Sequence, residues 1–197
     1  MENLVAIVIA VLTTLISPLI LEWFKNKLRK PKPDPLREAI NHNEQINHQL
    51  ELITEEIKVD RIWIAMFHNG GHFYPTGKSI QKFSILHEMT NLETASVMDT
   101  FQNIPVSLFP KPLASLYNKG EFHFTNESPS NFSCFDKNNE MCSTSMFSIE
   151  DLEGRFIGVM SLEFKQSKEF TTENYIFIRN KLGIIGGILS NYLIKIK

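Results

Sequence analysis

A long apolar run near the N-terminus is the feature that most constrains this chain of 197 residues. Residues 4–21 contain no charged side chain, and a basic stretch follows them closely. A bilayer core needs about 20 mostly apolar residues in a helix, because the backbone must satisfy its own hydrogen bonds there. The run therefore predicts a single transmembrane anchor at residues 1–24.

The charges beside this run predict its orientation. Only Met1-Glu2-Asn3 precede it, whereas five basic residues follow it: Lys25, Lys27, Arg29, Lys30 and Lys32. Positive flanks stay in the cytoplasm, so we expect the N-terminus outside, the body of the chain in the cytoplasm and the lipid bilayer as a partner. A cleaved signal peptide or a buried core helix are the alternatives. The run lacks a basic n-region and an A-x-A-like cleavage site, and it is apolar on all faces.

Residues 25–35 read as a basic, proline-rich juxtamembrane linker that leads into one domain at 36–197. Asp34 and Pro35 are typical of a helix start, so we expect a helix at 36–58. The formal net charge is −2, which gives no support for nucleic-acid binding. Two cysteines in a cytosolic domain should be reduced, and they do not suggest a disulfide framework.

Two helices carry apolar residues at heptad-like spacing. In the first, Ile46, Leu50, Ile53 and Ile57 lie four, three and four residues apart. A C-terminal helix at 171–196 continues the same pattern through Ile178, Leu182, Ile185, Leu189, Tyr192 and Ile196. This spacing is typical of a coiled-coil seam. We therefore expect a homodimer formed through helices 36–58 and 171–196.

Between these helices the pattern changes to that of strands. Arg61–Phe67 is apolar on both faces, which indicates a central strand. Further strands are expected at Lys82–Met89 and Glu121–Thr125, and a hairpin is expected from Thr144–Ile149 and Arg155–Phe164. We expect short helices at 92–102 and 109–118 and a long loop at 126–142. The sequence thus predicts an α+β fold.

The order of these elements resembles that of a GAF domain. The segments MFSIEDLEGRFIGVMSLEF and KEFTTENYIFIRNKLGIIGGILSNYL resemble the usual GAF ending, with Gly154 in the hairpin turn and Gly158 in the last strand. The resemblance implies an antiparallel sheet of about six strands, terminal helices packed on one face and a small-molecule pocket on the other. As a class, GAF domains bind cyclic nucleotides, tetrapyrroles, small metabolites or nothing.

The H-N-G-G segment after the first strand, with Lys82, Ser84 and Glu88 on the second, resembles GAF-like proteins of bacteria and their phages. If the terminal helices cover the Trp63 face of the sheet, His68 points towards the pocket. His68 and Asn69 then line a ligand site. The alternative is a tight Asn-Gly hairpin turn with no ligand.

Alternation places Lys82, Ser84, Leu86 and Glu88 on one face of the second strand, where they could hold a polar ligand, and His87 on the other. A solvated face of an edge strand explains the same pattern. Aromatic residues, which could line a flat-ring pocket or simply form a core, include Phe67, Phe73, Tyr74, Phe83, Phe101 and Phe109. The predicted ligand-binding residues are His68, Asn69, Phe73, Tyr74, Lys82, Ser84 and Glu88.

Other kinds of chemistry have weaker support. The histidines and cysteines match no compact metal-binding spacing, so no metal site is predicted. Cys134 and Cys142 in a loop resemble the cysteines of GAF-type methionine sulfoxide reductases, although the flanks of Cys134 hold no Lys or Arg that would activate its thiol. No catalytic motif of another class occurs. An enzyme is therefore the minor alternative.

The predicted function is that of a membrane-anchored sensor or regulatory module without an output domain of its own. Its small-molecule ligand, any cofactor and its protein partner cannot be named from the sequence. The alternatives are a structural or dimerisation module without a ligand and the reductase.

Overall fold

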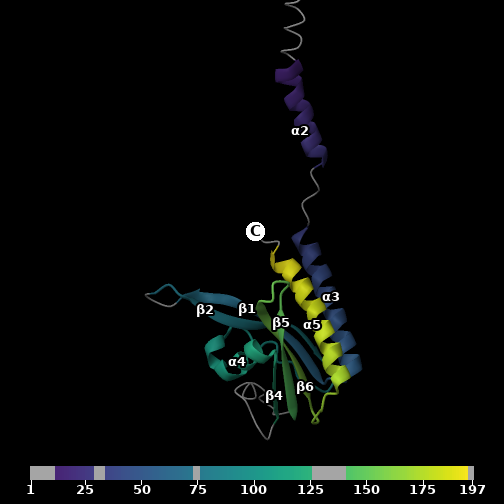
Figure 1. Cartoon of the computed structure of the whole chain (residues 1–197), viewed down its shortest axis with the longest axis vertical. Helices are drawn as coiled ribbons and strands as arrows, with labels where there is room; N and C mark the ends of the chain where they lie inside the picture. The colour runs from purple at the N-terminus through teal and green to yellow at the C-terminus, as the bar shows by residue number, and fades with distance from the viewer. Residues whose placement is uncertain (1–11, 29–33, 73–75, 126–140, 195–197) are drawn as a thin grey trace, which may run out of the picture. The chain divides into compact units, whose positions relative to one another are not determined.

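The computed structural model describes residues 12–28, 34–72, 76–125 and 141–194. The chain forms two compact units, Met1–Glu38 and Ala39–Lys197, which we describe separately. Figure 1 shows the elements along the chain.

In the N-terminal unit, the described residues form a π-helix at Leu12–Ile16 and an α-helix, α2, at Ser17–Leu28. Helix α2 has 12 residues and includes Glu22, Lys25 and Lys27. No helix in the described part of the chain is both long enough and apolar enough to cross a membrane. The prediction of a single-pass membrane protein with an outer N-terminus and a cytoplasmic domain is therefore wrong. Residues 4–11 of the apolar run lie outside the described residues.

From residue 35 onward the chain is α+β. Its elements are α3 (Pro35–Ile57), β1 (Arg61–His72), β2 (Ser79–Thr90), β3 (Ile104–Pro105), the 3₁₀ helix η2 (Val106–Leu108), α4 (Pro110–Lys119), β4 (Glu121–Thr125), β5 (Ser143–Glu150), β6 (Phe156–Phe164) and α5 (Thr172–Ile194). The strands form one antiparallel sheet in the order β3-β2-β1-β6-β5-β4. The predicted six-stranded antiparallel sheet is confirmed.

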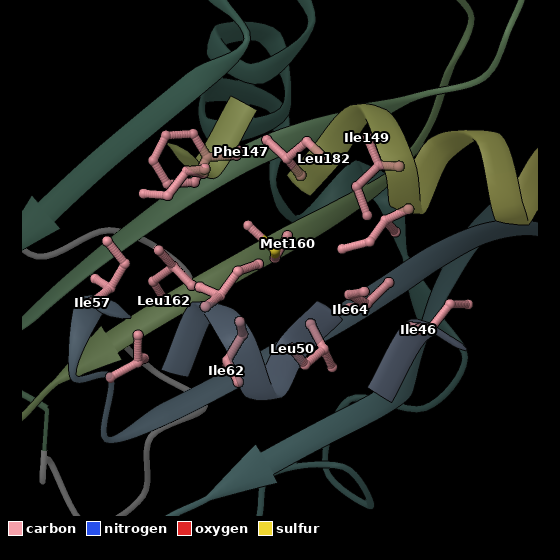
Figure 2. Close-up of a cluster of buried hydrophobic side chains, with 14 of the residues drawn as sticks. Ile46, Leu50, Ile57, Ile62, Ile64, Phe147, Ile149, Met160, Leu162 and Leu182 are labelled. Carbon is pink, nitrogen blue, oxygen red and sulfur yellow. The ribbon is translucent and has the colours of Figure 1, made fainter. Parts of the chain in front are cut away.

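The two long helices α3 and α5 lie side by side on one face of the sheet (Figure 1). They run in opposite directions, because Lys181 Nζ donates to Gln49 Oε1 at 3.2 Å while the rings of Tyr192 and His42 are 5.5 Å apart. Figure 2 shows their apolar side chains packed against those of the sheet. This core contains Ile46, Leu50, Ile53, Ile57, Ile62, Ile64, Met160, Leu162, Ile178, Leu182, Ile185 and Leu189.

This packing corrects our interpretation of the heptad-like spacing. Apart from Tyr192, the described residues of both seams are buried against the sheet of their own chain, so this spacing is explained without a coiled coil between two chains. A helix lying on a sheet also needs one apolar stripe at this spacing. The homodimer stays a prediction.

The opposite face of the sheet carries α4 and a second core. The rings of Trp63 and Phe101 are 5.6 Å apart, and those of Phe83 and Phe109 are 5.7 Å apart. All four side chains are buried. These aromatic residues therefore form a core, which was the alternative to a flat-ring pocket.

Residues 92–102 form turns rather than the predicted helix. The carboxylate of Glu88 accepts hydrogen bonds from the backbone N–H groups of Val97 (2.8 Å) and Met98 (3.2 Å) and from the hydroxyl of Ser96. Side chains that bind backbone groups in this way compete with helical hydrogen bonds.

A β-bulge changes which side chains of β2 face the helices. Ile64 pairs with His87, but the next residue, Ala65, pairs with Ile85, so Leu86 is an extra residue in β2. One extra residue reverses the alternation of side chains beyond it. Lys82, Ser84 and His87 consequently share the helix side, and Glu88 lies on the α4 side. The prediction that Ser84 and Glu88 share a face and that His87 opposes them is wrong.

The H-N-G-G segment is not a tight turn. Strand β1 continues to His72, and Asn69 pairs with Gln81 across the hairpin. The predicted Asn-Gly turn is wrong because this hairpin extends further than the apolar residues of its strands.

Candidate functional site

A cavity of about 410 Å³ lies between the sheet and the helices α3 and α5. Ile46 and Leu189 form part of its wall, and both also belong to the core between the sheet and these two helices. The described residues that line it are His42, Asn43, Ile46, Met66, Phe67, His68, Ser84, Leu86, His87, Gln102, Leu189 and Tyr192. We call this space the helix-side cavity. Its size and its mainly apolar wall with a few polar groups are typical of small-molecule sites.

His68 and Ser84 meet in this wall from adjacent strands. The distance from His68 Nε2 to Ser84 Oγ is 2.9 Å, and Ser84 Oγ also accepts the backbone N–H of Asn103 at 2.8 Å. His68 Nδ1 is 3.4 Å from the carbonyl oxygen of Asn69, which can only accept. In the neutral ring, Nδ1–H then donates to that carbonyl, and the Ser84 hydroxyl donates to Nε2.

His87 is fixed by helix α3. Its Nδ1 is 3.0 Å from Asn47 Oδ1, so Nδ1–H donates to this amide oxygen. Burial lowers the pKa of His87 below its ordinary value of 6.5, so the ring is neutral at pH 7. In that state, Nε2 carries a lone pair to which no group among the described residues donates.

Gln102 and His42 add further polar groups to the wall of the cavity. Gln102 Nε2 donates to the carbonyl oxygens of Ile85 (2.9 Å) and Met98 (2.8 Å), which places this side chain beside the bulge in β2. His42 Nδ1 is buried and has no hydrogen-bond partner among the described residues. A buried polar atom without a partner is costly, and a ligand can satisfy it.

The structure brings only some of the predicted site residues together. His68 and Ser84 line the helix-side cavity. Contrary to our assumption, α3 and α5 cover the face of β1 that carries Ile62, Ile64 and Met66, not the Trp63 face. Lys82 pairs with His68 across the hairpin, and its side chain lies against Gly70. Phe73 and Tyr74 lie outside the described residues.

Glu88 and Asn69 are engaged elsewhere. Glu88 holds the turn at Ser96–Met98 on the α4 side, and Asn69 Oδ1 accepts Gln81 Nε2 at 3.0 Å. Neither lines the helix-side cavity. The binding role of all seven residues stays a prediction.

Sequence reasoning missed His42, Gln102 and Tyr192. His42 and Tyr192 belong to helices far apart in the sequence, and only the antiparallel packing of α3 and α5 brings their rings together. Gln102 lies in a segment that we expected to be helical. His87 also lines the cavity but was not among the predicted ligand-binding residues, because alternation placed it on the face opposite Ser84.

A second hollow lies on the α4 side. It is a groove of about 740 Å³ lined by Phe67, Gln81, Val106, Leu113, Tyr117, Glu150, Gly154, Arg155 and Phe156. Tyr117 is 73% exposed, and Arg155 is paired with Asp151 and Glu153. Its wall therefore offers one exposed ring and a cation whose charge is already matched, whereas no Lys or Arg is among the described residues that line the helix-side cavity.

The cysteine and metal predictions are only partly visible in the structure. Cys134 lies outside the described residues, and Cys142 is a free thiol whose backbone N–H donates to Phe164. Within the described part of the chain, no group of three or more His, Cys, Asp or Glu side chains is arranged to hold a metal ion.

Solved structures provide the comparison that decides the fold. A GAF domain/HD domain protein from Geobacter sulfurreducens is 13% identical, with a TM-score of 0.59 over 78% of this chain and 94% of that one. The GAF domain of a two-component sensor histidine kinase from Bacillus halodurans is 13% identical, with a TM-score of 0.54 over 77% and 97%. This chain has a GAF-like fold. The fold inferred from the hairpin and terminal helix is confirmed.

A third similar structure is a phycocyanobilin-bound GAF domain from a cyanobacterial phytochrome. It is 10% identical, with a TM-score of 0.54 over 84% of this chain and 99% of that one. No protein-family model matches the sequence. No curated protein matches it either. These comparisons establish the GAF-like fold and leave the ligand to be argued from the site.

Proposed function

We propose that this GAF-like domain is a sensor or regulatory module that binds a small molecule in the helix-side cavity. The observation that carries this proposal is the cavity of about 410 Å³ between the sheet and the terminal helices, lined by apolar residues and a few polar atoms. At about 30 Å³ per water molecule, this space corresponds to about 14 waters. It is therefore large enough for a metabolite-sized ligand.

The position of the cavity supports a regulatory role. His42 and Asn43 of α3 and Leu189 and Tyr192 of α5 form one side of it, and β1 and β2 form the other. A ligand that contacts both sides stabilises the packing of the terminal helices against the hairpin. Such a ligand can change a population of conformations because it binds one arrangement better than another.

The solved structures with this fold give general support. One is the GAF domain of a sensor histidine kinase, and another holds phycocyanobilin. A role as a small-molecule sensor is thus known for the fold, while the ligand and its place in this chain follow from the residues described above.

Native mass spectrometry of the full chain tests the proposal. We expect a non-covalently bound molecule, either co-purified or taken up from a cell extract of small metabolites, that is released on denaturation. Leu86→Trp should abolish this binding, because Leu86 lines the cavity and is 53% exposed, so a larger side chain can enter the space without disturbing the core.

Leu92→Trp is the matched control, since Leu92 is fully exposed and does not line the cavity. It should bind as the unchanged chain does. A chain that binds no molecule, or one whose binding is equally retained in Leu86→Trp, would contradict the proposal.

A further inference from the structure

Within the part of the chain that the structure describes, the helix-side cavity has no formally charged side chain in its wall. Among its lining residues there is no Asp, Glu, Lys or Arg. A charged ligand would lose its hydration without gaining an opposite charge, which is costly in a partly buried site. The wall therefore favours an uncharged ligand.

The hydrogen-bond donors of this wall are largely used within the protein. Both N–H groups of Gln102 donate to backbone carbonyls, so its Oε1 remains as an acceptor. The single hydroxyl proton of Ser84 is directed to His68 Nε2. Ser84 Oγ has two lone pairs, and only one is used by the N–H of Asn103.

The histidines also add hydrogen-bond acceptors to the wall. His87 donates through Nδ1–H to Asn47, so its Nε2 can only accept while the ring is neutral. His42 Nδ1 is buried and unpartnered among the described residues, and it is an acceptor when the neutral ring carries its proton on Nε2. Asn43 and Tyr192 can both donate and accept, so they do not change the balance. Free acceptors thus outnumber free donors in the wall.

If the cavity is the ligand site, as proposed above, its lining also defines the class of ligand. We propose that the ligand is an uncharged molecule with an apolar ring or chain that presents N–H or O–H donors, such as a primary amide or an N–H heterocycle. Its donors bond to Gln102 Oε1, Ser84 Oγ, His87 Nε2 or His42 Nδ1, and its apolar part lies against Ile46, Met66, Leu86 and Leu189.

Three small probes of the same shape test this proposal on the full chain at pH 7.5. Benzamide presents N–H donors, acetophenone replaces its amide by a methyl ketone that only accepts, and benzoate replaces it by an anion. Binding is measured by chemical-shift changes of the histidine rings in NMR titrations. We expect benzamide to bind about tenfold more tightly than either analogue, because only its donors pair with the free acceptors.

A matched pair of variants tests whether the tighter binding of benzamide depends on a residue of the cavity wall. His42→Phe removes an acceptor that makes no hydrogen bond within the described residues and keeps a ring beside Tyr192. It should weaken benzamide several-fold and leave acetophenone unchanged. His48→Phe changes an exposed histidine of the same helix that does not line the cavity, and it should leave both affinities unchanged.

The outcomes separate this inference from the proposed function. If acetophenone or benzoate binds as tightly as benzamide, or if no probe binds, the donor-bearing class is wrong. The mass-spectrometry test with Leu86→Trp then still decides whether the cavity binds a small molecule at all. A co-purified ligand that is charged or lacks donors would overturn this inference and leave the proposed function standing.

Discussion

Glu163 is the centre of a buried polar cluster that includes Arg61 and Trp63. Its carboxylate accepts Arg61 Nε at 2.6 Å and Trp63 Nε1 at 2.5 Å, and Arg61 Nη1 also donates to the carbonyl of Ala95 at 2.9 Å. Arg61 is 2% exposed and Glu163 is 6% exposed. This group ties β1 to β6 and to the loop after β2.

We expect Glu163→Gln to lower the free energy of unfolding by about 3–5 kcal/mol, because it leaves the Arg61 charge buried without a counter-charge. Urea unfolding followed by circular dichroism measures this change. Glu153→Gln is the control, since Glu153 forms an exposed ion pair with Arg155 and should matter by less than about 1 kcal/mol. Similar losses in both variants would contradict a special role for Glu163.

Two glycines of α5 provide an internally matched test of how this helix packs. A Cβ at Gly186 would collide with the carbonyl oxygen of Glu150, whereas a Cβ at Gly183 would meet no atom within 4 Å. We expect Gly186→Ala to destabilise the fold by about 1–3 kcal/mol through overpacking. Gly183→Ala should stabilise it by about 0.4–1 kcal/mol. Thermal unfolding measures both changes, and a shift of the same sign in the two variants would show that the helix lies elsewhere.

Burial of His87 gives a defined pH dependence. Its pKa in the folded state lies below 6.5, so the unfolded chain binds more protons as the pH falls through 6.5. The contribution to stability is complete above that value and is lost as the pH falls from 6.5 towards the folded pKa.

In His87→Gln the free energy of unfolding should therefore fall less between about pH 7 and pH 5 than in the unchanged chain. The fall should be unaltered in His48→Gln, since His48 is exposed. Urea unfolding at a series of pH values measures these slopes. Equal slopes in His87→Gln and the unchanged chain would contradict the assignment of a buried, neutral ring.

At the scale of elements, the helices show what apolar spacing can and cannot predict. The spacing in α3 and α5 correctly indicated two amphipathic helices, because a period near 3.6 residues follows from helix geometry. It could not say whether the apolar stripe meets a second chain or the sheet of its own chain. The same residues would satisfy either contact.

This distinction gives a prediction for α5. Leu182 is 9% exposed and packs in the helix-side core, while Ile176 in the same helix is 57% exposed. We expect Leu182→Asn to lower the free energy of unfolding by at least about 2 kcal/mol at any protein concentration. Ile176→Asn should change it little. If Leu182→Asn altered only the sedimentation of the chain and not its stability, the residue would belong to an interface between chains.

The strand β2 shows why the site was harder to predict than the fold. Its start and end were close to expectation. The bulge at Leu86 interrupts the alternation of side chains along Lys82–Met89, and nothing in those eight residues indicates it. His68 and Ser84 do meet, since both lie between the bulge and the hairpin turn on paired strands. Glu88 lies beyond it and faces the other core.

At the scale of the whole molecule, sequence pattern predicted the order of most elements and the GAF-like fold. It misjudged the N-terminal apolar run, because the run does not show where a helix begins and ends, and the described helix α2 starts at Ser17 and includes Glu22, Lys25 and Lys27. It also could not place His42, Gln102 and Tyr192 around one cavity. Their meeting depends on tertiary packing of segments separated by up to 150 positions in the sequence.

The central claim is that a small molecule binds between the sheet and the terminal helices. Amide hydrogen exchange of the full chain, with and without the extract of small metabolites used for the mass-spectrometry test, tests it most directly. We predict slower exchange at the cavity, in segments 42–46, 84–87 and 186–192, and no change along α4 or at 154–156 beside the second groove. Slower exchange confined to α4 and 154–156, or none anywhere, would contradict the account.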